Sequence, residues 1–73
     1  MADGVIMAKL TPREREVAKL LAQGQRQSSI AKALCISPRT VEHHVKNARA
    51  KVGAVSSFDL ALQIALEDRG NPA

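Results

Sequence analysis

A chain of 73 residues has room for one small domain, and its 45% of apolar residues are almost all alanine, valine, leucine and isoleucine. Phe58 is the only aromatic residue, which argues against RNA or single-strand modules that stack bases on aromatic rings. The net charge of +4 is unevenly placed, because residues 26–51 carry six cations against Glu42 alone. We therefore predict a compact all-α domain with a basic middle third that suits a polyanion.

The first nine residues show no regular pattern and predict a flexible N-terminal arm (1–9). They contain neither the signal-peptide pattern nor a membrane span, so we expect no contact with a membrane. The single cysteine, Cys35, excludes an intramolecular disulfide. It stands between Leu34 and Ile36, a setting typical of a small buried hydrophobe in a reducing, cytoplasmic protein.

Four helices with readable ends are predicted between residues 10 and 68. The first begins with a capping box at Thr11-Pro12-Arg13-Glu14 and ends at Gly24. A second runs from about 28 to 35, and only a short turn separates it from a third over 38–52, capped by Ser37 and ended by Gly53. Ser56 or Ser57 caps a fourth helix that ends near residue 68, and residues 69–73 form a flexible tail.

The third helix has a narrow apolar side and a polar, mostly basic outer side. At helical spacing, Val41, Val45, Ala48 and Val52 share one side. The opposite side carries Arg39, His43, Lys46, Asn47 and Ala50. Such a helix can lie in the major groove of double-stranded DNA while its apolar side packs on the domain.

The fourth helix carries more apolar surface than one core face needs. Phe58, Ala61, Leu62 and Ala65 fall together on the side that we assign to the core. Leu60 and Ile64 fall roughly opposite, and Gln63 and Glu67 lie beside them. Single exposed apolar residues are common, but two adjacent ones on a terminal helix favour a dimer interface with a second copy of the chain. We therefore assign that interface to Leu60, Ile64, Gln63 and Glu67.

An ordered set of motifs over about residues 10–66 resembles the LuxR-type (GerE-type) helix-turn-helix domain of bacterial transcription regulators. The set begins with Leu10-Thr11-Pro12-Arg13-Glu14-Arg15-Glu16-Val17 and Leu21-Ala22-Gln23-Gly24, and continues with Ile30-Ala31, Leu34, Ile36-Ser37, Thr40-Val41, His44-Val45 and Lys51-Val52-Gly53. The resemblance implies a four-helix domain that binds DNA through its third helix and dimerises through its fourth. It also implies a cytoplasmic location, at the bacterial nucleoid.

Carried over by position, the resemblance and the helix spacing suggest two sets of DNA-contacting residues. Base edges would be read by Glu42, His43, Lys46 and Asn47. The phosphate backbone would be contacted by Gln27, Ser28, Ser37, Arg39, Thr40, His44 and Lys51, with helix-flank packing as the alternative role of His44. Glu42 accepts hydrogen bonds but repels phosphates, so it favours sequence discrimination over affinity.

Other function classes find less support in the residues. Adjacent histidines point about 100° apart on a helix, and no second cysteine or carboxylate pair accompanies them, so we expect no metal and no cofactor. No nucleophile–base pair or phosphate loop indicates an enzyme. The alternatives are a helix-turn-helix module that pairs with and antagonises a larger regulator, and region four of a sigma factor. RNA polymerase or a larger regulator are further candidate partners, and the chain is either a stand-alone protein or an excised domain.

Overall fold

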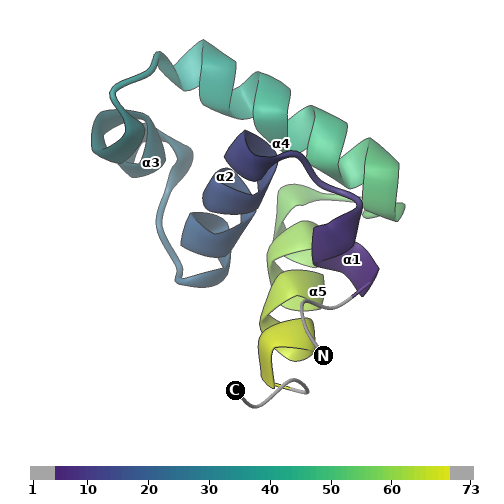
Figure 1. Ribbon diagram of the computed structural model, residues 1–73. Helices are drawn as coiled ribbons and strands as arrows, with labels where there is room; N and C mark the ends of the chain where they lie inside the picture. Colours follow the sequence, from purple (N-terminus) through teal and green to yellow (C-terminus); the bar gives the residue numbers. More distant parts are fainter. Residues whose placement is uncertain (1–4, 70–73) are drawn as a thin grey trace.

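The computed structural model describes residues 5–69 and folds this stretch into five α-helices (Figure 1). They are α1 (Val5–Ala8), α2 (Pro12–Ala22), α3 (Gln27–Leu34), α4 (Pro38–Val52) and α5 (Ser57–Arg69). No strand occurs in the described stretch. The all-α class is confirmed, with α1 added to the four helices that the sequence predicts. Residues 1–4 of the expected arm and 70–73 of the expected tail lie outside the described residues.

The start of α2 has the capping box that its sequence predicts. The Glu14 N–H donates to Thr11 Oγ1 over 3.2 Å, and the Thr11 N–H donates to Glu14 Oε1 over 3.0 Å. Pro12 occupies the first helical turn, where its missing N–H costs no hydrogen bond. At the other end Gly24 takes a φ of +90°, a conformation that glycine adopts without steric cost.

The α3–turn–α4 unit is a helix-turn-helix with a tight connection. Cys35 takes the left-handed conformation with φ of 58°, and the Ile36 N–H donates to the Ala31 carbonyl, which closes the end of α3. Cys35 is exposed, so its assignment as a buried hydrophobe is wrong. The left-handed backbone turns its side chain out of the stripe that Ile30 and Leu34 direct inward.

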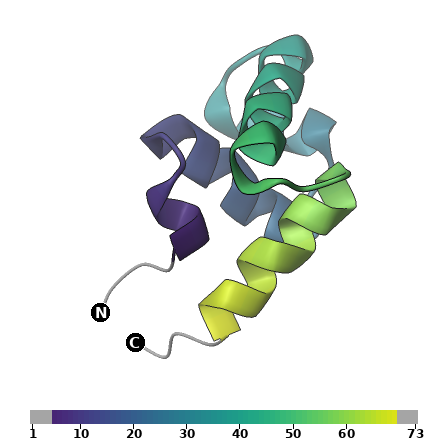
Figure 2. The same ribbon diagram turned by 90° about the vertical axis from the view of Figure 1, so that its right-hand side faces the viewer.

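The core lies between α2 and the helices that surround it, with α2 packed against α3, α4 and α5. Both views place α4 along one margin of the molecule, with the C-terminal part of α5 at the opposite side (Figures 1 and 2). The buried apolar side chains come from all five helices and their connections: Met7, Leu10, Val17, Ala18, Ile30, Ala31, Val41, Val45, Ala48, Ala54, Leu60 and Ile64. The outer side of α4 is thereby left to solvent.

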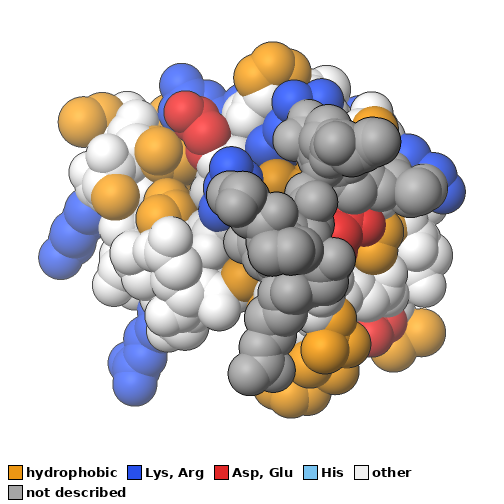
Figure 3. Space-filling view, turned by 60° about the horizontal axis from the view of Figure 1, so that its bottom comes forward, with side chains coloured by type: hydrophobic (Ala, Val, Ile, Leu, Met, Phe, Trp, Pro, Cys, Tyr) orange, Lys and Arg blue, Asp and Glu red, His pale blue; other side chains and the backbone are white. Residues whose placement is uncertain are grey.

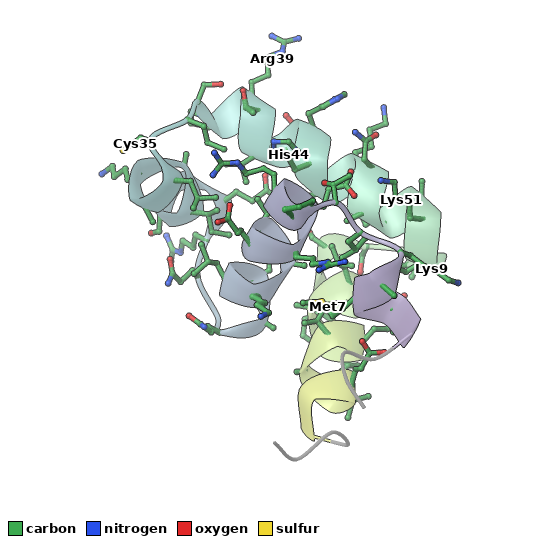
Figure 4. The ribbon with its side chains drawn as sticks, in the orientation of Figure 1. Met7, Lys9, Cys35, Arg39, His44 and Lys51 are labelled. Carbon is green, nitrogen blue, oxygen red and sulfur yellow. The ribbon has the colours of Figure 1, made fainter. Side chains whose placement is uncertain are left out.

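The segment before α2 is ordered against the domain, which corrects the expectation of a loose arm for residues 5–9. The Glu67 carboxylate on α5 accepts from the Ile6 N–H over 2.9 Å and from the Met7 N–H over 3.1 Å. Met7 is buried in the core (Figure 4). A four-residue helix has no periodicity to detect, and its acceptor lies about sixty residues away in the chain.

The face of α5 that enters the core is the opposite of the predicted one. Leu60 and Ile64 are each fully buried, whereas Phe58 is 77% exposed. The predicted dimer interface through Leu60 and Ile64 is therefore wrong, because both side chains are already enclosed by their own domain. The physical reason is that Leu60, Ile64 and Glu67 share one side of the helix. When that side faces the domain, Leu60 and Ile64 enter the core and the Glu67 carboxylate accepts from the Ile6 and Met7 amides of α1.

Candidate nucleic-acid interface

The outer side of α4 is a polar surface whose orientation is fixed by a buried apolar stripe on the other side of the helix. Val41, Val45 and Ala48 are all at most 3% exposed and fix the rotation of the helix about its axis. Of the residues that the spacing predicts on the other side, Arg39, His43, Lys46 and Ala50 are exposed and Asn47 is half-buried. Glu42 is exposed as well. Figure 4 shows Arg39 extending away from the domain at the start of α4.

A shallow hollow on this surface gathers many of the predicted DNA-contacting residues. Its lining is Ser37, Arg39, Thr40, Glu42, His43 and Lys46. Ser37 caps α4 by accepting from the Thr40 N–H over 3.1 Å, and the two hydroxyl groups lie 2.9 Å apart. Within the described residues Glu42, Arg39 and Lys46 form no ion pair. No salt bridge among the described residues therefore neutralises these three charges on the outer side of the helix.

Two of the predicted base readers contact each other. Nδ2 of Asn47 lies 3.2 Å from Nε2 of His43, one helical turn earlier. His43 is exposed and Asn47 is half-buried. The adjacent His44 is half-buried on the flank, and the centroids of the two histidine rings lie 6.3 Å apart.

Lys51, predicted to contact the phosphate backbone, is 39% exposed and pairs with a carboxylate of its own domain. Its Nζ lies 2.7 Å from Oε1 of Glu14, whose side chain is only 5% exposed. Burial alone would raise the pKa of Glu14, but hydrogen bonds from Lys51 and Thr11 and the positive charge of Lys51 outweigh it and lower the pKa. The pair joins the first turn of α2 to the last turn of α4, a contact that no spacing within one helix could predict.

The remaining predicted backbone contacts lie at the start of α3. Gln27 is half-buried and Ser28 is exposed. Arg26 occupies the N-cap position without a side-chain hydrogen bond to the helix. The first N–H groups of α3, which include those of Gln27 and Ser28, therefore receive no side-chain cap from Arg26.

Two arginines that the sequence presents as surface charges make internal hydrogen bonds. Nε of Arg15 donates to the carbonyls of Met7 and Leu10 over 2.9 and 3.1 Å. Nη2 of Arg49 donates to the Val55 carbonyl over 2.7 Å. Arg49 therefore joins the end of α4 to the connection with α5. Charge counting cannot find these roles, because each acceptor is a backbone carbonyl and carries no formal charge.

The surface of α5 carries apolar side chains where the sequence predicted core. Phe58, Leu62 and Leu66 are 77%, 45% and 55% exposed and follow one another at intervals of four residues. Hydrophobic side chains gather at one margin of the face in Figure 3. Of the two polar residues assigned to the interface, Gln63 donates to Asp59 over 3.2 Å and Glu67 holds α1.

The described residues contain no group of three His, Cys, Asp or Glu side chains placed to hold a metal ion. Across the same stretch, none of the helices is long and apolar enough to cross a membrane.

Comparison with known families adds the decisive observation. Residues 8–64 match the model of the GerE domain, described as bacterial regulatory proteins of the luxR family. The chain belongs to the luxR family. The matched stretch includes α2, α3 and α4 completely and most of α5. The family assignment that the motifs suggested is therefore confirmed, and this chain is a helix-turn-helix domain of that family.

Two of the three relatives named here are described as transcriptional regulators. The chain is 42% identical over 64 residues, 88% of its length, to an HTH-type transcriptional regulator of Mycobacterium bovis, of which it covers 7%. It is 46% identical over 52 residues to the transcriptional regulatory protein UhpA of Escherichia coli, with 71% of this chain and 26% of UhpA aligned. It is 50% identical over 44 residues to the spore germination protein GerE of Bacillus subtilis, with 60% of each chain aligned. The chain thus spans only a small part of the first of these relatives.

Proposed function

We propose that this luxR-family domain binds double-stranded DNA sequence-specifically and regulates transcription, with α4 in the major groove. The observation that carries the proposal is the outer side of α4, where Arg39, Glu42, His43 and Lys46 are exposed around one hollow. The buried stripe of α4 leaves this side facing outward along one margin of the molecule (Figure 2). An α-helix presented in this way fits the width of the major groove.

Within this proposal the residues divide by chemistry. Glu42 and Lys46 offer an acceptor and donors to base edges, since Glu can accept from cytosine N4 and Lys can donate to guanine. The backbone contacts come from both ends of the α3–turn–α4 unit: Gln27, Ser28, Ser37, Arg39 and Thr40, with His44 on the flank. Lys51 would contribute less than its charge suggests, because Glu14 already pairs with it.

A homodimer is the second part of the proposal, through a different face of α5 from that first predicted. Phe58, Leu62 and Leu66 form an exposed apolar stripe on the side away from the buried Leu60 and Ile64. Two copies joined through this stripe would place their α4 helices toward successive turns of DNA, about 34–36 Å apart. A transcription regulator that binds a two-fold operator needs such an arrangement.

The binding proposal is tested by fluorescence anisotropy with a labelled duplex at 50 and 200 mM salt. Lys46→Ala should weaken binding and flatten the salt dependence by about one unit of log–log slope. Lys19→Ala is the matched control, because it removes an equal charge from the exposed last turn of α2. Equal effects of the two substitutions, or salt-insensitive binding of the native chain, would contradict the proposed interface.

The dimer is tested separately by sedimentation with and without DNA. Leu62→Asp should abolish self-association and leave the helical circular dichroism spectrum unchanged, because Leu62 lies on the surface. Self-association that survives both Leu62→Asp and Phe58→Asp would exclude this face of α5.

A further inference from the structure

The contact between Asn47 and His43 constrains which atoms of the histidine carry protons. Nδ2 of Asn47 faces Nε2 of His43 over 3.2 Å, and in this orientation of the amide Nε2 is the acceptor, because a primary amide nitrogen has two hydrogens to donate and accepts none. An imidazolium carries hydrogens on both ring nitrogens and offers no acceptor. With these two nitrogens facing each other, the contact matches the tautomer whose single hydrogen is on Nδ1.

We propose that Asn47 is a positioning residue that holds His43 as the Nδ1–H tautomer, and that His43 determines specificity by donating to a base acceptor. This inference rests on the proposed DNA-binding function and deepens it. A histidine side chain in water favours the Nε2–H tautomer, so Asn47 would reverse the ordinary preference. The tautomer of a histidine is generally set by the hydrogen bond that its other nitrogen makes.

The burial of the two side chains supports this division of roles. Asn47 is half-buried, whereas His43 is exposed and lines the hollow on the outer side of α4. Asn47 thus lies nearer the domain and His43 nearer any ligand in that hollow. Asn47 acts through His43 and is not itself the reader.

The proposal specifies a class of base edge. A ring that donates from Nδ1 can bond the N7 or O6 atom of guanine, the N7 atom of adenine or the O4 atom of thymine, and it is mismatched with the amino group of cytosine. Glu42, the preceding residue, has the opposite requirement and accepts from an amino group. The two neighbours therefore select a base acceptor beside a base donor, a stricter requirement than two donors would impose.

The tautomer is tested first, in the protein without DNA, by ¹⁵N NMR of histidine-labelled chain at a pH where both rings are neutral. We expect a protonated Nδ1 and an unprotonated Nε2 for His43, and a return to the Nε2–H pattern in Asn47→Ala. His44 is the control within the same sample, since its ring is adjacent and no hydrogen bond joins it to Asn47. An Nε2–H pattern for His43 in the native chain, or no change in Asn47→Ala, would overturn the proposal.

The consequence for specificity is tested by selecting duplexes from a randomised pool with the native chain, His43→Ala, Asn47→Ala and the double variant. We expect both single variants to relax the preference at the same base position, each roughly fivefold, and the double variant to add nothing further. Preferences lost at two different positions would show that Asn47 reads a base independently. Failure of the native chain to bind any duplex would instead refute the proposed function, and the NMR result would still decide the tautomer.

Discussion

Glu14 shows how one carboxylate can serve the start of one helix and the end of another. It accepts from the Thr11 N–H in the capping box and from Nζ of Lys51 on α4. Spacing alone predicted the first contact, because capping boxes have a fixed offset of three residues. The second joins residues 37 positions apart, and only the packing of α4 across α2 creates it.

Replacing Glu14 by Gln should lower the free energy of unfolding by about 1–3 kcal/mol, because the charge-assisted bond to Lys51 is lost in a buried setting. Glu16→Gln is the control, since Glu16 pairs with Arg13 on the surface and such pairs contribute about 0–1 kcal/mol. Urea denaturation followed by circular dichroism measures both. Similar losses for the two variants would contradict the structural role of Glu14.

The same residue predicts a direction for the pH dependence of stability. The folded-state pKa of Glu14 is lower than that of the unfolded chain, so the unfolded state binds a proton first as the pH falls. The contribution of Glu14 is complete above the ordinary pKa of a glutamate and disappears as the pH falls through the lower folded-state value. Denaturation at a series of acidic pH values should show this loss in the native chain and a weaker one in Glu14→Gln.

At the scale of elements, the sequence predicted where the main helices begin and end better than which way each one faces. Caps and stop signals located α2 and α4, because Thr11, Ser37 and Gly53 act within one turn of chain. Which side of α5 faces the core was not predictable in this way, because apolar residues occur on all sides of that helix. The large side chain of Phe58 suggested the core, yet the domain accommodates Leu60 and Ile64 instead.

A pair of leucines on α5 measures this difference directly. Leu60→Ala should cost about 2–5 kcal/mol of stability, because it opens a cavity at a fully buried position. Leu66→Ala should change stability by less than about 0.5 kcal/mol in the monomer, since that side chain is 55% exposed. Thermal unfolding of dilute protein gives both values, and the reverse order would contradict the packing of Leu60 in the core.

On the scale of the whole molecule, α1 and α5 bring residues near the two ends of the chain together. Figure 2 shows α1 on the same side of the molecule as the C-terminal part of α5, and Glu67 accepts from both Ile6 and Met7. The sequence could not predict this contact, because the donors in α1 and the acceptor in α5 lie about sixty residues apart and no sequence motif links them. Likewise, it predicted the outward residues of α4 but not the internal partners of Arg49 and Lys51.

Glu67→Ala should expose the start of the chain without unfolding the helix-turn-helix. We expect faster hydrogen exchange at the Ile6 and Met7 amides, by roughly tenfold for a lost charge-assisted hydrogen bond. The amides of α4 should keep their protection, because α4 packs mainly on α2 and α3. Uniformly faster exchange throughout the domain would show that the contact instead supports the whole fold.

The internal use of Arg49 and Lys51 has a consequence for how the protein would search a chromosome. Binding to DNA of arbitrary sequence depends on how many phosphates a protein neutralises, and each lost contact shortens the life of such complexes. With Lys51, itself exposed, paired to Glu14 and Arg49 bonded to the Val55 carbonyl, Arg39 and Lys46 are the exposed cations of α4 that make no salt bridge within the described residues. A regulator of this kind would dissociate quickly from DNA of unrelated sequence. It would then search for its operator by repeated dissociation and rebinding more than by sliding along the duplex.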